Sequence, residues 1–160
     1  MKRIFAVLIM HLLPLSAWAD LPGVREWRVE QKLDKTYATV YAALEAHRFF
    51  IVFEVDIAGN LKGFAERWGD DYNRNQLEGV RSLVFCNGWY ANQVSNQDPR
   101  LLALCPLRIS LIHKDGVTRV LFVRPTHIAV GSDGMEIAKD LEAAVAAAIE
   151  EGITRALETP

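Results

Sequence analysis

The sequence has few of the features that identify an enzyme or a nucleic-acid-binding protein. It has no phosphate-binding loop, no Gly-x-Ser-x-Gly motif and no His-Glu-x-x-His zinc helix. It also has no basic cluster, and its 18 basic residues are outnumbered by 20 acidic ones. Binding to nucleic acid depends on neutralising phosphates with lysine and arginine, so we expect no nucleic-acid partner. We also expect no catalytic residue, no cofactor and no metal ion.

Long apolar runs are missing everywhere except at the N-terminus. Lys2 and Arg3 precede an apolar run over residues 4–13, and a small-residue segment over residues 17–19 follows it. This order is typical of a secretory signal peptide, with cleavage between residues 19 and 20. The run is shorter than the ~20 apolar residues that a membrane span needs, so we expect no membrane insertion after cleavage. The residues predict an exported, periplasmic protein.

Linkers, repeats and low-complexity segments are absent as well. Cleavage would leave residues 20–160, which is the length of one ordinary domain. The two basic residues of the signal would leave with it, so 16 basic residues would stand against 20 acidic ones. We therefore expect a single, mildly acidic, soluble α/β domain.

Hydrophobic periodicity divides this domain into strands and helices. The expected elements, in chain order, are an edge strand over 24–32, a helix over 34–47, a strand over 49–57, a helix over 61–68, a strand over 80–86, short helices over 89–94 and 99–104, strands over 107–113 and 117–124, and a long alanine-rich helix over 135–157. Asp115-Gly116 between two β-rich runs is a strong hairpin signal. The order favours an α+β fold in which a single antiparallel or mixed sheet carries helices on one face.

Three motifs carry a resemblance to a known family. They are Asp56-Ile57-Ala58 with Asn60, Phe85-Cys86-Asn87, and Cys105-Pro106-Leu107-Arg108 ahead of the hairpin. Together they resemble the domain of unknown function 302 family over about residues 35–157. The resemblance implies a small α/β domain that forms dimers, and it leaves the activity open. Both cysteines depart from the family pattern, which commonly has glycine in place of Cys86 and an aliphatic residue in place of Cys105.

Cys86 and Cys105 form the first candidate site. In an exported domain a pair of cysteines is usually a disulfide, because the compartment is oxidising. The bond would close a loop of about twenty residues and stabilise the fold by ~3 kcal/mol. Two reduced core cysteines, a reactive thiol pair, and a copper or zinc site with one of the histidines are the other interpretations. We favour the disulfide, since the spacing is not Cys-x-x-Cys and no two histidines have the spacing of a ligand pair.

The loop between the cysteines suggests a second candidate, a site for a small polar ligand. Aromatic side chains offer contact area and amide side chains offer hydrogen bonds. In the competing interpretation the aromatic residues close the end of the sheet and the amides cap short helices. The candidates are Asn87, Trp89, Tyr90, Asn92, Gln93 and Arg108. Asp56, at the end of a strand, is more typical of a cap or of one member of an ion pair than of a general base, and Arg108 or Arg124 is a candidate partner for it.

These observations favour a non-catalytic binding or accessory protein of the periplasm, with its site at residues 86–105. A thiol-dependent redox or sulfur-handling protein that uses Cys86 and Cys105 is the alternative from the enzyme class. A third possibility is a structural homodimer module, in which the alanine-rich helix over 135–157 supplies the interface.

Overall fold

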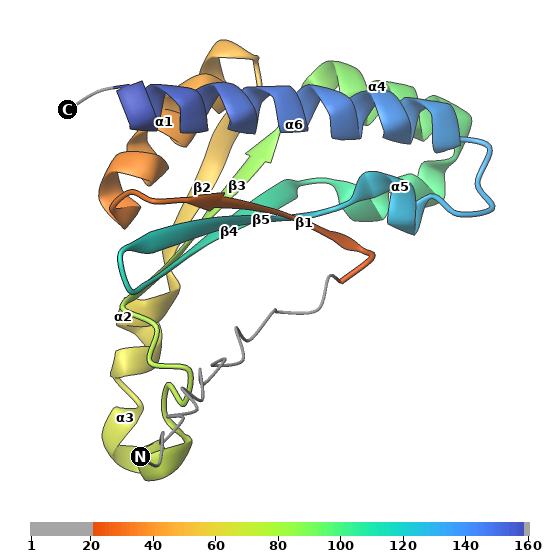
Figure 1. The fold of residues 1–160 in the computed structure, drawn as a ribbon. Helices are drawn as coiled ribbons and strands as arrows, with labels where there is room; N and C mark the ends of the chain where they lie inside the picture. The colour runs from red at the N-terminus through yellow and green to blue at the C-terminus, as the bar shows by residue number, and fades with distance from the viewer. Residues whose placement is uncertain (1–20, 159–160) are drawn as a thin grey trace, which may run out of the picture.

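A five-stranded antiparallel sheet organises the chain, with its strands in the order β1-β5-β4-β3-β2 (Figure 1). The computed structural model describes residues 21–158, so the expected signal peptide lies outside the described residues. The strands are β1 (Val24–Val29), β2 (Phe50–Asp56), β3 (Gly79–Cys86), β4 (Leu107–Lys114) and β5 (Val117–Val123). The sheet and its helices confirm the expected α+β fold, and β1 is an edge strand as predicted.

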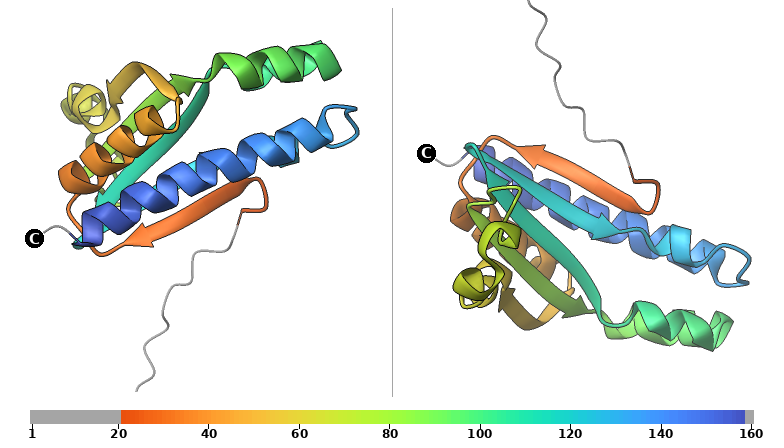
Figure 2. Two further views of the ribbon diagram at one scale, coloured as in Figure 1. Left: turned by 90° about the horizontal axis from the view of Figure 1, so that it is seen from above. Right: turned by 90° about the horizontal axis from the view of Figure 1, so that it is seen from below.

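Helices of different lengths connect the strands. They are α1 (Leu33–Ala46), α2 (Ile57–Lys62), α3 (Ala65–Trp68), the 3-10 helix η1 (Gly69–Asp71), α4 (Gly88–Gln97), the 3-10 helix η2 (Pro99–Leu104), α5 (Pro125–Ile128) and α6 (Met135–Glu158). Helices α1 and α6 lie side by side over one face of the sheet (Figure 2). Helices α2 and α3 lie on the other side, in a projection that we call the arm (residues 57–78) (Figure 1). Within residues 21–158, no helix is long and apolar enough to cross a membrane.

The hydrophobic core lies between the sheet and the two long helices. Alternate residues of the three central strands point toward α1 and α6, as period-two patterning requires. The largest fully buried side chains are Phe49, Phe85, Phe122, Leu44, Leu83, Ile109, Leu111, Leu141, Ile149, Val29, Val40 and Val94.

The small residues of α6 are used within the chain. Ala138, Ala148 and Ala156 are fully buried, and Gly152 lies directly against the backbone of α1. The structure therefore shows that these small residues of α6 pack within the core of one chain. Self-association stays a prediction, and a dimer would need another surface than these buried residues.

The β4–β5 hairpin confirms the Asp-Gly signal. Asp115 and Gly116 both have positive φ values, of 51° and 75°. A two-residue turn of this kind needs positive φ at both positions, and asparagine, aspartate and glycine tolerate it best.

The predicted helix over 61–68 is wrong in its bounds. The chain turns into α2 directly after β2, at Ile57, and a second short helix begins at Ala65. The early start has a local cause, because Asp56 caps the first turn of α2. The interruption falls at Gly63, a residue with low helix propensity.

Candidate functional site

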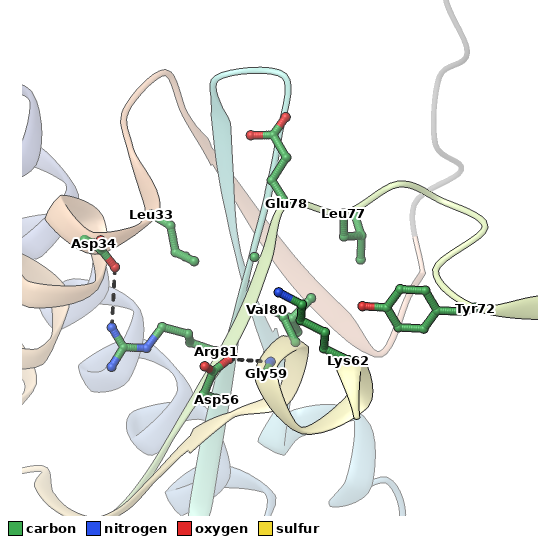
Figure 3. A pocket seen from close by; sticks show the side chains of 12 residues that line it. Leu33, Asp34, Asp56, Gly59, Lys62, Tyr72, Leu77, Glu78, Val80 and Arg81 are labelled. Atoms are coloured by element: carbon green, nitrogen blue, oxygen red, sulfur yellow. Dashed lines mark hydrogen bonds and ion pairs between the residues drawn. The ribbon is translucent and has the colours of Figure 1, made fainter. Parts of the chain in front are cut away.

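A pocket of about 400 Å³ lies where the arm leaves the sheet (Figure 3). The start of α1, the arm and the start of β3 contribute to it. The lining residues are Leu33, Asp34, Asp56, Ala58, Gly59, Lys62, Tyr72, Leu77, Glu78, Gly79, Val80 and Arg81. It therefore joins three segments that are separated in the sequence.

The turn from β2 into α2 sets one wall of the pocket. The Asp56 carboxylate accepts a hydrogen bond from the backbone N–H of Gly59 at 2.9 Å, which caps the helix as the sequence suggested. A Cβ atom on Gly59 would lie 2.5 Å from Oδ2 of Asp56, so a larger residue here would have to displace the capping carboxylate. The cap thereby fixes where the arm begins and holds Asp56 at the edge of the pocket.

Arg81 lies next to Asp56, because the two residues are partners across strands β2 and β3, and its side chain is held by two contacts (Figure 3). Its guanidinium carbon lies 3.6 Å from the centroid of the Tyr37 ring, which is a cation–π geometry. Its Nη1 atom lies 3.6 Å from Oδ1 of Asp34. The Tyr37 hydroxyl donates a hydrogen bond to the Glu54 carboxylate, and burial together with this bond raises the pKa of Tyr37. The Arg81 guanidinium thus already has Asp34 and Tyr37 as partners.

A further carboxylate of the lining, that of Glu78, also has partners. It accepts a hydrogen bond from the backbone N–H of Asp115 at 3.0 Å, and its Oε2 atom lies 3.6 Å from Nε2 of His113. These contacts tie the end of the arm to the β4–β5 hairpin.

Lys62 and Tyr72 differ from these residues, because their polar ends are unpartnered within residues 21–158. Figure 3 shows both side chains pointing from the arm toward the middle of the pocket. Asp56 also makes no ion pair in this part of the chain, with Lys62 or with any other residue. The pocket therefore presents an ammonium group, a hydroxyl and a carboxylate that a bound molecule can engage.

The residues predicted as ligand contacts lie elsewhere, at the other end of β3. Asn87 caps α4 by accepting hydrogen bonds from the backbone N–H groups of Trp89 and Tyr90 at 3.0 and 3.2 Å. Tyr90 stacks on Phe49 with ring centroids 5.9 Å apart, and its hydroxyl donates to the Asp140 carbonyl. The structure thus shows the capping and packing roles of Asn87 and Tyr90. None of the six candidates, which also include Asn92, Gln93 and Arg108, lines the pocket.

The expected adjacency of the two cysteine segments is confirmed, but the disulfide is not formed in the structure. Strands β3 and β4 pair with Phe85 opposite Leu107, which brings Cys86 and Cys105 to adjoining strand ends. Both thiols are free and half-buried. Cys105 packs against the hydrophobic core, whereas strand alternation turns Cys86 toward the opposite face from Phe85. Burial and the nearby Cys86 raise the pKa of Cys105.

The histidines do not join the cysteines. His113 makes a 2.9 Å hydrogen bond between its Nδ1 atom and the Thr118 hydroxyl, and His47 pairs with Glu151 at 2.7 Å. Within residues 21–158, no three histidine, cysteine, aspartate or glutamate side chains are grouped so that they could hold a metal ion. The three-ligand copper or zinc alternative is therefore not assembled there.

Sequence reasoning missed Lys62 and Tyr72. Tyr72 lies between the expected helix over 61–68 and the expected strand over 80–86, where no element was predicted, and Lys62 lies in a helix whose predicted bounds were wrong. The available signal was the Asp56-Ile57-Ala58 motif directly after a strand, which marks the capped turn that starts the arm.

Comparisons with known proteins give a family and a fold. The model of the family "Domain of unknown function DUF302" matches residues 25–152. A solved structure, "Crystal structure of uncharacterized conserved protein DUF302 from Bacillus stearothermophilus", is similar with a TM-score of 0.70 and 19% identity. The similarity covers 82% of this chain and 98% of that one, and at this identity it shows the fold alone. Among curated proteins none matches the chain. The family match spans most of the chain, which therefore belongs to the DUF302 family.

Proposed function

We propose that this protein is exported and binds a small polar ligand, without transforming it, in the pocket between the arm and the sheet. The observation that supports the proposal is the direction of Lys62 and Tyr72, whose unpartnered polar ends converge on the pocket within the described part of the chain (Figure 3). Ligand sites are typically concave, with apolar walls and a few convergent polar groups. Export rests on the signal-like sequence of residues 1–19.

The pocket is a better site than the loop over residues 86–105. In the loop, the Asn87 amide oxygen already caps α4, and the Tyr90 hydroxyl already donates a hydrogen bond to the Asp140 carbonyl. In the pocket, the polar groups of Lys62 and Tyr72 have no such use within residues 21–158.

A thermal-shift screen tests the proposal. The protein beginning at residue 20 is screened against amino acids, organic acids, polyamines and sugars. A ligand at 100 times its Kd stabilises the native state by about 2.7 kcal/mol, which appears as a higher Tm. We expect Lys62→Met to abolish the shift. Lys139→Met is the matched control, because Lys139 is an exposed lysine of α6 that pairs with Glu136. Mass spectrometry should recover the ligand unchanged.

Two outcomes of the screen would contradict binding in the pocket. If no compound of these classes raises the Tm, or if Lys62→Met and Lys139→Met respond alike, the pocket is not the binding site.

The second candidate is a thiol-dependent redox or sulfur-handling protein. It is favoured by two unbonded thiols, Cys86 and Cys105, at adjoining ends of paired strands. Its test is the rate at which reduced Cys105 reacts with an alkylating reagent.

A further inference from the structure

The pocket contains two opposite charges that are not paired with each other. Asp56 stands at the N-cap of α2 and Lys62 is the last residue of the same helix. A rise of 1.5 Å per residue separates their Cα atoms by about 9 Å along the helix. No ion pair joins their side chains, and neither forms one with another residue of the range 21–158. The space between an unpaired anion and an unpaired cation is therefore open to a ligand.

The other charged side chains of the pocket, those of Asp34, Glu78 and Arg81, already have contacts within the described residues. Arg81 pairs with Asp34, and Glu78 contacts His113 and the backbone of Asp115. A ligand that engaged one of these side chains would compete with an existing contact. The charged groups that a ligand can bind without this competition are the Asp56 carboxylate and the Lys62 ammonium group.

Each end of this pair has the chemistry to hold a complementary group. Tyr72 lies on the same side of the pocket as Lys62 in Figure 3, so a hydroxyl donor and an ammonium donor are available together. Asp56 uses Oδ1 for the helix cap, and Oδ2 makes no hydrogen bond to the described residues. Leu33, Leu77 and Val80 add apolar surface to the lining.

We propose that the ligand is a zwitterion of the amino-acid class, whose carboxylate binds Lys62 and Tyr72 and whose ammonium group binds Asp56. The inference rests on the proposed function and names the ligand class of the same pocket. A ligand with both charges satisfies both pocket charges. A ligand with one charge leaves the other pocket charge without a partner, so it makes fewer hydrogen bonds to charged groups and binds more weakly. The apolar lining takes the side chain of the ligand.

Four probes that share one side chain test the proposal by isothermal titration calorimetry. L-leucine carries both charges, N-acetyl-L-leucine only the carboxylate, L-leucinamide only the ammonium group, and N-acetyl-L-leucinamide neither. We expect L-leucine to bind most tightly. Each singly charged probe should bind at least about 10-fold more weakly, because a hydrogen bond to a charged group is lost.

Two variants connect each ligand charge to one residue. Asp56→Asn keeps a helix-capping side chain but removes the charge. It should weaken L-leucine and L-leucinamide by about 10-fold and leave N-acetyl-L-leucine unchanged. Lys62→Met should weaken L-leucine and N-acetyl-L-leucine and leave L-leucinamide unchanged. Asp70→Asn, on the arm but outside the lining, is the control and should change none of them.

The outcomes separate this inference from the proposed function. If N-acetyl-L-leucine or L-leucinamide binds as tightly as L-leucine, the zwitterion is overturned while the pocket remains a site. If none of the four probes binds, the zwitterion is also overturned, and a pocket-dependent hit in the thermal-shift screen would still uphold the proposed function. If L-leucine binds equally to Asp56→Asn, Lys62→Met and the natural chain, both proposals fall.

Discussion

The Cα atom of Val40 lies 2.6 Å from the position that a Cβ atom on Gly152 would occupy. The carbonyl oxygen of Thr39 lies 2.9 Å from the same position, so α1 and α6 meet here backbone to backbone. Backbone atoms cannot move away as a flexible side chain can. We therefore expect Gly152→Ala to lower the free energy of unfolding by about 1–3 kcal/mol, as overpacking does. Urea denaturation followed by circular dichroism measures the change.

The direction of this effect is diagnostic, because alanine normally stabilises a helix by about 1 kcal/mol relative to glycine. Gly88→Ala is the matched control, since Gly88 begins α4 and no atom lies within 4 Å of its would-be Cβ. The control should be neutral or slightly more stable. A Gly152→Ala variant as stable as Gly88→Ala would contradict the close approach of α1 and α6.

A buried carboxylate should make stability fall in acid. Glu142 accepts hydrogen bonds from Nε of Arg124 at 2.8 Å, from the backbone N–H of Thr126 at 3.1 Å and from the Thr126 hydroxyl. Burial alone would raise the pKa of Glu142, but the bonds from Thr126 and Arg124 outweigh it and lower the pKa below its usual value. Because the pKa is lower in the folded state, the stabilisation is complete above the unfolded pKa, about 4.3. It is lost as the pH falls through the folded pKa.

The variant Glu142→Gln separates this contribution from the rest of the chain. At pH 7 it should be less stable by about 1–3 kcal/mol, because the bonds to a charged acceptor are lost. Between pH 7 and pH 3 its free energy of unfolding should fall less than that of the natural chain. Glu136→Gln, which changes an exposed residue paired with Lys139, is the control. Equal pH dependence in Glu142→Gln and the natural chain would show that Glu142 does not carry the effect.

The sheet and its long helices could be predicted because the buried side of each element makes apolar residues recur at regular spacing in the sequence. Leu83 and Phe85 alternate with less buried residues along β3, and Leu141, Val145 and Ile149 recur at helical spacing along α6. The period indicates which side of a strand or helix is buried. Here the buried sides are those by which the sheet and the two long helices pack on each other.

The arm shows where this reasoning fails. Leu61, Phe64 and Trp68 have the spacing of an apolar helix face, yet they are 40%, 45% and 40% exposed. Phe64 and Trp68 stack on each other, with ring centroids 4.9 Å apart, in the arm. An apolar pattern cannot tell whether anything covers it. In this segment the local cap at Asp56 decided where the helix begins.

The pocket could not be predicted from the sequence for a related reason. Its lining comes from the ranges 33–34, 56–62 and 72–81, and no local pattern states that these segments meet. The family motif at Asp56 marked the turn, but the positions of Lys62 and Tyr72 depend on how the whole arm folds back on the sheet.

The proposed export gives a prediction that a mass measurement checks. The protein recovered from the periplasm of a bacterial host should begin at Asp20, because small residues at 17 and 19 follow the short apolar run. Intact-mass spectrometry should find a chain that lacks residues 1–19. Replacing Ala19 with a bulky residue, as in Ala19→Phe, should leave an uncleaved precursor. Periplasmic protein that retains residue 1 would reverse the localisation.

The last prediction concerns the reactivity of Cys105. The thiolate is the reactive form of cysteine, and burial together with the nearby Cys86 raises the pKa of Cys105. In reduced protein at pH 7, Cys105 should therefore react with iodoacetamide more slowly than free cysteine, and its rate should keep rising at pH values where free cysteine has levelled off. The Cys86→Ser variant isolates Cys105 and keeps its burial, the larger of the two causes of the raised pKa, and labelling is followed by mass spectrometry.

Two comparisons decide what the rate means. Unfolding the Cys86→Ser variant in urea should bring the Cys105 rate close to that of free cysteine, since the burial is then gone. A Cys105 that reacts at least as fast as free cysteine while folded would contradict its burial against the core and would support the thiol-dependent function. A slow thiol in the folded protein would instead make Cys105 a packing residue beside β4, because a redox-active thiol needs a lowered pKa and access to its partner.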